Sequence, residues 1–237
     1  RGSEEEVRRR QAAYVEHFVG RQPVIDIGCG RGEFLGLLRD AGIQAVGVDS
    51  SSAMVRHCLE KGVVACHSDG VTYLSRAADQ SIGSVFCSHV LEHMRPDAMS
   101  ALLRLCHDKL VPGGVLVVET VNPCCLSTHA SFAADPAHER PLHPDWLAFL
   151  LEISGLEPIA RIGLSPHAEE ARLAAVPEAG RRNGDPLIRI FNENVEKLNQ
   201  LLFGCSDYAV IARVVGGSPA CATTGCPACI AAGSTCP

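Results

Sequence analysis

Short apolar runs alternate along the chain with segments in which apolar residues recur every three or four positions. A short apolar run bounded by glycine or polar residues is typical of a buried strand, and the wider spacing is typical of a helix with one buried face. The runs predict strands over residues 23–27, 45–48, 63–66, 83–88, 115–119, 157–163 and 208–214. The wider spacing predicts helices over residues 4–19, 34–41, 51–61, 71–77, 96–110, 144–154 and 187–202.

This alternation of strands and helices predicts an α/β fold with helices on both faces of a seven-stranded, mostly parallel sheet. Residues 111–114 form a turn by composition, and residues 171–185 read as a polar loop marked by glycine and proline. Because the last strand follows a long excursion, we expect it to be inserted antiparallel. We divide the chain into an N-terminal helix over residues 1–20, one domain over 21–214 and a tail over 215–237.

Composition adds only a few constraints. The 237 residues are 46% hydrophobic and 20% charged, as is ordinary for a globular protein. The formal net charge of −6 argues against a nucleic-acid partner, because phosphate recognition usually needs clustered Lys and Arg. No apolar run reaches the roughly 18 residues of a membrane span. The opening Arg1-Gly2-Ser3 resembles the remnant of a purification tag and no signal peptide follows, so we expect a cytoplasmic protein.

The tail is a separate problem, because four of the twelve cysteines fall in its last seventeen residues: Cys221, Cys226, Cys229 and Cys236. Three interpretations stay open. The small and polar composition fits a flexible extension. The four cysteines could instead bind zinc or an iron–sulfur cluster, although only one C-x2-C pair is present. Alternatively, Gly216-Gly217 could precede a peptide that the domain itself modifies.

The strongest chemical signal is the glycine loop Gly28-Cys-Gly30-Arg-Gly32, which directly follows the first strand. Ligands of open α/β sheets bind at the carboxyl ends of the strands, and glycine lets the backbone approach such a ligand closely. Acidic residues accompany the loop at successive strands: Asp26 within the first, Asp49 at the end of the second and Asp69 after the third. A carboxylate at the second strand can accept both hydroxyls of a ribose.

The segments Val24-Ile-Asp-Ile-Gly-Cys-Gly-Arg-Gly32 and Val46-Gly-Val-Asp49 resemble the motifs of class I methyltransferases, which have a Rossmann-like fold and use S-adenosylmethionine. The resemblance implies that Gly28, Gly30 and Gly32 pass the methionine part of the cofactor, with Asp26 nearby. It also implies that Asp49 and Ser50 hold the ribose and that Asp69 and Gly70 lie against the adenine. Met54 either packs on the purine or belongs to the core. The G-x-G-x-G spacing makes an NAD-dependent enzyme the weaker alternative.

The segment His89-Val-Leu-Glu92-His93 matches the H-x-x-E-H pattern of some zinc peptidases, which need both histidines on one helix and a further ligand. Here the pattern straddles the end of a predicted strand. It also resembles the V-x-E-H segment of small-molecule methyltransferases, which implies that Ser88 and His89 line the cofactor pocket while His93 faces the acceptor. A purely structural, hydrogen-bonded role for His93 stays open. No metal-ligand set is clear in residues 21–214.

The loop after the fifth strand contains several charged, histidine and aromatic residues: Phe132, Asp135, His138, Arg140, His143 and Trp146. It could simply cap the next helix. The run from Asn122-Pro123 through this loop, with Asn192 to Arg213, resembles methyltransferases of bacterial polysaccharide and O-antigen synthesis, although Ala133 and Ala134 replace the usual aromatic residues.

That resemblance implies O-methylation of a sugar, a glycan or a similar small polar acceptor. We expect His138 or His93 to be the base, since a histidine pKa near about 6.5 suits proton removal from a hydroxyl. Arg140 or Asp135 is expected to orient the acceptor. The alternatives are methylation of a peptide, including the chain's own tail, and a scaffold that binds S-adenosylmethionine without catalysis.

Overall fold

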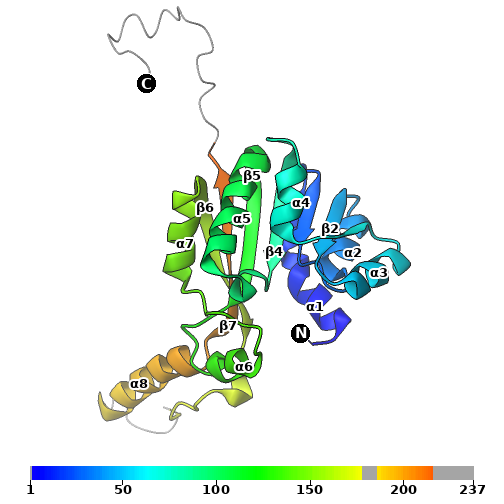
Figure 1. Cartoon of the computed structure of the whole chain (residues 1–237). Helices are drawn as coiled ribbons and strands as arrows, with labels where there is room; N and C mark the ends of the chain where they lie inside the picture. Colours follow the sequence, from blue (N-terminus) through cyan, green and yellow to red (C-terminus); the bar gives the residue numbers. More distant parts are fainter. Residues whose placement is uncertain (1, 178–185, 216–237) are drawn as a thin grey trace, which may run out of the picture.

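Seven strands form one sheet in the computed structural model, which describes residues 2–177 and 186–215 (Figure 1). Their order across the sheet is β3-β2-β1-β4-β5-β7-β6. The strands are β1 (Val24–Ile27), β2 (Ala45–Asp49), β3 (Ala65–His67), β4 (Ile82–Ser88), β5 (Leu110–Val121), β6 (Leu156–Pro166) and β7 (Cys205–Val214).

The strands run parallel from β3 to β5, and β7 lies antiparallel between β5 and β6. The predicted fold, including the inserted last strand, is therefore confirmed. Because β7 is reversed, its first residues pair with the last residues of β5, as Asp207 does with Val121. The amino end of β7 thus lies at the same edge of the sheet as the carboxyl ends of the parallel strands, where ligands of such sheets bind.

Helices cover both faces of the sheet (Figure 1). The α-helices are α1 (Glu4–Gln11), α2 (Glu33–Asp40), α3 (Ser52–Glu60), α4 (Gly70–Arg76), α5 (Pro96–Lys109), α6 (Thr128–Ala134), α7 (Pro144–Ile153) and α8 (Pro186–Leu202). Short 3-10 helices span Ala12–Phe18, Leu91–His93 and Glu169–Ala171. None of the helices in the described ranges has the length and hydropathy needed to cross a membrane.

Each face has its own apolar core. On one side, α5 and α7 pack on the sheet through fully buried leucines such as Leu103 and Leu151. On the other side, the 3-10 helix Ala12–Phe18 and α2 form an aromatic cluster, in which the rings of Phe34 and Phe86 have centroids 4.0 Å apart. This second core packs the N-terminal segment against that face of the sheet.

Three local predictions differ from the structure. The single helix expected over residues 4–19 divides into α1 and the 3-10 helix, and the turn expected at 111–114 lies inside β5. There the pairing shifts from Ile82 with Leu110 to Ser84 with Val115, so the four turn residues form a bulge opposite one residue of β4. Helix α6 was not expected, because its sequence THASFAA has no helical spacing of large apolar residues.

Candidate active site

The chain turns sharply at the carboxyl end of β1, where glycines occupy three alternate positions. Gly28, Gly30 and Gly32 have positive φ values of 71°, 54° and 78°, a region that residues with a Cβ rarely adopt. A Cβ added at Gly28 would lie 2.3 Å from Cγ2 of Val90, in the loop after β4. Glycine is therefore needed at position 28 both for the turn and for the close approach of the two loops.

Asp49 at the end of β2 holds this loop in place. One carboxylate oxygen accepts the backbone N–H of Gly30 at 2.9 Å, and the other accepts the N–H of Ser51 at 2.8 Å. Each carboxylate oxygen can accept further hydrogen bonds. The carboxylate therefore links the ends of two parallel strands and can still bind hydroxyl groups of a ligand.

A cavity of about 400 Å³ lies beside the glycine loop. Six of the predicted cofactor residues line it: Gly28, Asp49, Ser50, Asp69, Gly70 and His89. Asp69 also caps α4, because its carboxylate accepts the N–H of Thr72 at 2.8 Å, and hydrogen bonds with the side chain and the backbone of Thr72 lower the pKa of Asp69. Met54 lies half-buried in the first turn of α3 and is not among the residues that line this cavity.

A narrow cavity of about 20 Å³ continues on the other side of Gly28, toward α1. The predicted residues Asp26 and Ser88 line it and are both buried. Arg10 lines it from α1, and the Nε of this guanidinium is buried with no hydrogen-bond partner among the described residues. The cavity thus presents a carboxylate and a guanidinium to the same small space.

His89 is the centre of a buried group of charges at the carboxyl ends of β4 and β5. Its Nδ1 lies 3.0 Å from Oε1 of Glu92, and its Nε2 lies 3.4 Å from Oε1 of Glu119. Burial alone would lower the pKa of His89, but the hydrogen bonds to Glu119 and Glu92 outweigh it and raise that pKa to about 10. His89 is therefore an imidazolium at neutral pH and is not suited to act as a base.

The imidazolium in turn keeps its neighbours ionised. Burial would raise the pKa of both glutamates, yet His89 holds the pKa of Glu92 and Glu119 below the usual value. Asp207 from β7 lies 3.9 Å from His89, and there burial dominates and raises the pKa of the carboxyl. Arg10 adds a second positive charge, 3.6 Å from Asp207.

Arg10, Glu92, Glu119 and Asp207 were not predicted as site residues. Glu119 carried one usable signal, since it is an acid at the end of an otherwise apolar strand. Arg10 and Asp207 lie in segments that resemble the polysaccharide methyltransferases, but no local pattern gave either residue a role, because their place depends on how α1 and β7 pack against the rest of the sheet.

A polar cavity of about 320 Å³ adjoins the cavity of about 400 Å³ beside the glycine loop. His89 and His93 line both of these cavities. Further residues that line it come from α1, α6, β7 and the loop before α7: Glu6, Arg10, Phe132, Asp135, His138 and Asp207. The predicted catalytic residues His93, His138 and Asp135 are thus brought together. Since most of the lining is polar or charged, the cavity suits a polar ligand.

His93 and His138 are held in the same way. Nδ1 of His93 lies 3.1 Å from the carbonyl oxygen of Ala137, and Nδ1 of His138 lies 2.8 Å from that of Phe132. A carbonyl oxygen only accepts, so each Nδ1 carries a proton, and the tautomer that this geometry selects has its lone pair on Nε2. The two rings lie 4.6 Å apart, and the ring of Phe132 stacks on His138 at 4.3 Å.

Arg140 is not among the residues that line these cavities. Its guanidinium packs over the ring of Trp146, 5.3 Å from the centroid, as a cation–π pair. Asp135, the other residue expected to orient the acceptor, lines the polar cavity and has Oδ2 3.9 Å from Nε2 of His138.

The zinc-peptidase interpretation of residues 89–93 does not fit the structure. His89 precedes the 3-10 helix Leu91–His93 with a φ of 54°, so the two histidines do not share one helical face. The cysteines of the tail, Cys221, Cys226, Cys229 and Cys236, lie outside the described residues.

Comparisons with known proteins agree on one family. Residues 4–160 match the family described as "Methyltransferase domain". The chain is 29% identical over 170 residues to a probable S-adenosylmethionine-dependent methyltransferase from Mycolicibacterium smegmatis, covering 71% of this chain and 65% of that protein. It is 35% identical over 115 residues to a ubiquinone biosynthesis O-methyltransferase from Xanthomonas euvesicatoria, covering 46% of each. The chain therefore spans about half to two thirds of the length of these curated relatives.

Solved structures are similar over more of the chain. A SAM-dependent methyltransferase from Archaeoglobus fulgidus superposes with a TM-score of 0.85 and 38% identity, covering 90% of this chain and 95% of that one. A 1,6-didemethyltoxoflavin-N1-methyltransferase from Burkholderia thailandensis, solved with S-adenosylhomocysteine, has a TM-score of 0.56 and 17% identity, covering 88% and 78%. The second likeness concerns the fold alone.

Proposed function

The chain belongs to the S-adenosylmethionine-dependent methyltransferases, and we propose that it methylates an oxygen of a small polar acceptor such as a sugar or glycan. The family agrees with the cofactor and the enzyme class predicted from the glycine loop. One observation carries the proposal: the cavity beside the glycine loop and the polar cavity meet at His89 and His93. A donor in the first would therefore face an acceptor in the second.

The residues of the donor side fit the cofactor. Gly28 lines the cavity beside the glycine loop, and the carboxylate of Asp49 lies where it can accept ribose hydroxyls. The unpartnered Nε of Arg10 suits the cofactor's carboxylate, and the buried Asp26 suits its ammonium group. When bound, S-adenosylmethionine supplies a methyl group on a positively charged sulfur, which is already activated for transfer.

The residues of the acceptor side have two tasks, to position the hydroxyl and to remove its proton. His93 or His138 takes the proton at Nε2, because Nδ1 of each ring is already donated to a carbonyl. The acceptor oxygen then bonds the methyl carbon while the carbon–sulfur bond breaks and leaves its electron pair on sulfur. We assign the orienting role to Asp135, because Asp135 lines the polar cavity and Arg140 does not.

A sugar or related polyol suits this cavity better than an apolar acceptor. Asp135 and the two histidines offer hydrogen-bond acceptors to hydroxyl groups, and the stacked ring of Phe132 offers an apolar surface to the C–H face of a sugar ring. The resemblance of residues 122–146 to polysaccharide methyltransferases supports the same class. An acceptor of the quinone type would leave many of these polar groups without partners, which is costly.

The test is a methyl-transfer screen with labelled S-adenosylmethionine across nucleotide sugars, glycan fragments, a catechol and the peptide of residues 216–237. We expect labelled O-methyl product with at least one sugar. Label in the catechol, in the peptide or in the chain itself, without label in any sugar, would overturn the sugar assignment. Binding of S-adenosylhomocysteine without transfer to any acceptor would favour a scaffold.

The base is tested separately with His93→Ala and His138→Ala, and His17→Ala serves as a control outside the site. We expect a fall of about 10²–10⁴-fold in turnover in at least one of the two site variants, as is usual when a general base is removed. S-adenosylhomocysteine binding shows that each variant is folded. Unchanged turnover in both would refute the assignment.

A further inference from the structure

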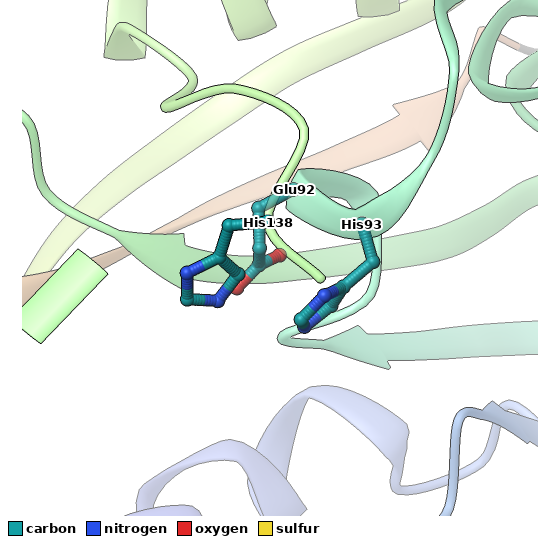
Figure 2. A group of neighbouring side chains, drawn as sticks. All are labelled: Glu92, His93 and His138. Carbon is teal, nitrogen blue, oxygen red and sulfur yellow. The ribbon is translucent and has the colours of Figure 1, made fainter. Parts of the chain in front are cut away.

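We propose that Glu92, His93 and His138 form a binding site for a divalent first-row transition-metal cation at the junction of the two cavities. One ligand-capable atom of each residue lies within 4.8 Å of those of the other two. Figure 2 shows the three side chains extending in the same direction, two from the short helix Leu91–His93 and one from the loop before α7. Two imidazoles and one carboxylate with open positions beside them are a common ligand set for such cations.

The two histidines are already prepared as ligands. A metal-binding imidazole usually donates its other N–H to a carbonyl or carboxylate, which fixes the ring and leaves a lone pair for the metal. Here Nδ1 of His93 and Nδ1 of His138 are both engaged with backbone carbonyl oxygens, those of Ala137 and Phe132. Nε2 is therefore the metal-facing atom of each ring.

Glu92 supplies an independent reason to expect a ligand. Its side chain is completely buried, and Oε1 lies 3.0 Å from His89. The other oxygen, Oε2, is buried and makes no hydrogen bond of ordinary geometry within the part of the chain that the structure describes, although the buried hydroxyl of Thr120 lies close enough to lower the pKa of Glu92. A buried carboxylate oxygen without a partner is costly and calls for an explanation. A cation held beside it by the two histidines would satisfy this oxygen.

A second group, His89 with Glu119 and Asp207, has the same spacing but is less suited to a metal. Both ring nitrogens of His89 are directed at carboxylates, Nδ1 at Glu92 and Nε2 at Glu119. Each nitrogen therefore serves as a hydrogen-bond donor and has no lone pair to offer. This second group instead supports the position of Glu92, the carboxylate ligand of the first.

Binding requires a small closure of the three side chains. Metal bonds of about 2.0–2.2 Å to nitrogen and oxygen place neighbouring ligand atoms roughly 3 Å apart, so the ligands must approach by up to about 2 Å. His93 and His138 can make this movement, because both are only partly buried and lie at the edge of a cavity. The remaining coordination positions would face that cavity and the acceptor.

The role of the cation rests on the proposed function. A hydroxyl bound to a divalent cation loses its proton more readily, since the metal stabilises the alkoxide. The proton leaves to solvent through the open side of the cavity, where Asp135 is exposed. The alkoxide oxygen then bonds the methyl carbon, and the electron pair of the carbon–sulfur bond stays on sulfur. With the cation bound, the two imidazoles act as ligands and the proton goes to solvent; without it, Nε2 of one of them is free to take the proton as proposed above.

The test begins with the full chain, treated with a chelator and titrated with Mn²⁺ while free Mn²⁺ is followed by electron paramagnetic resonance. Mn²⁺ is chosen because it has little preference for soft thiolate ligands, so the cysteines of the tail compete poorly for it. We expect one saturable site per chain. His93→Gln and His138→Gln should each weaken binding at least tenfold, and His17→Gln should bind as the unchanged chain does. Circular dichroism shows that each variant is folded.

Two results would overturn the metal site: no saturable Mn²⁺ binding, or unchanged affinity in both ligand variants. Methyl transfer at full rate after chelation would overturn the catalytic role of the metal and leave the proposed function standing. Conversely, a saturable site that both variants weaken, in a chain that methylates no acceptor, would support the metal site and overturn the proposed function.

Discussion

Replacing Gly28 by alanine tests how the glycine loop shapes the cofactor site. Alanine at a φ of 71° pays about 1–2 kcal/mol for the left-handed backbone conformation. Its Cβ would also lie 2.3 Å from Cγ2 of Val90, far inside the contact distance of about 3.5–4.0 Å. Overpacking of this kind usually costs a further 1–3 kcal/mol or so. Relief of the clash would push apart the glycine loop and the loop after β4, which both line the cavity of about 400 Å³.

Gly42 provides a matched control. It has the same φ of 71°, but a Cβ added there would meet nothing within 4 Å. Gly42→Ala should therefore lose only the backbone contribution, while Gly28→Ala loses about 1–3 kcal/mol more. For a domain of this size, each kcal/mol lowers the Tm by about 2–4 °C.

Thermal unfolding measures the stability, and calorimetric titration with S-adenosylhomocysteine measures the effect on the site. We expect Gly28→Ala to weaken binding at least tenfold, about 1.4 kcal/mol, and Gly42→Ala to leave it unchanged. Adding Val90→Ala to Gly28→Ala removes the methyl group that clashes, so a double-mutant cycle should show partial recovery. Equal Tm losses in the two single glycine variants, with unchanged affinity in both, would refute the reasoning.

Three further changes have defined expectations. Asp49→Asn turns one carboxylate oxygen into an N–H donor that faces a backbone N–H, so S-adenosylhomocysteine binding should weaken about tenfold by calorimetry. Leu151→Ala opens a cavity in the core under α7 and should cost about 2–5 kcal/mol in urea unfolding, and a loss below 1 kcal/mol would show that the core collapses around it. Asp135→Asn should raise the KM for the acceptor, whereas Arg140→Met should leave it within about twofold, and the reverse order would return the orienting role to Arg140.

The sequence predicted best those parts of the site that follow from the order of parallel strands. Gly28 comes directly after β1, and Asp49 is the last residue of the neighbouring strand β2. Their proximity therefore follows from the fold class alone. The same rule placed His89 at the end of β4. These positions need no knowledge of long-range packing, because all parallel strands end at one edge of the sheet.

The rest of the site depends on contacts between distant segments. Asp207 lies at the ligand-binding edge of the sheet only because β7 runs antiparallel. Arg10 lies beside it only because α1 packs against the rest of the domain. The protonation of His89 likewise depends on Glu119, thirty residues away on the next strand. Local pattern cannot reveal such partners, and for the same reason the unpaired oxygen of Glu92 had no signal in the sequence.

The insertion of β7 between β5 and β6 has a consequence for the order in which the protein folds during synthesis. Residues 205–214 leave the ribosome after the rest of the sheet, yet they pair with both β5 and β6. Until then β5 has an unpaired edge, and β6 has no neighbour in the sheet. A nascent chain synthesised only as far as α8 can fold the glycine loop, but it still lacks Asp207, which lines the polar cavity of about 320 Å³. Such late, long-range pairing is slow and leaves strand edges open to aggregation, so we expect the nascent chain to be most prone to aggregation in this interval.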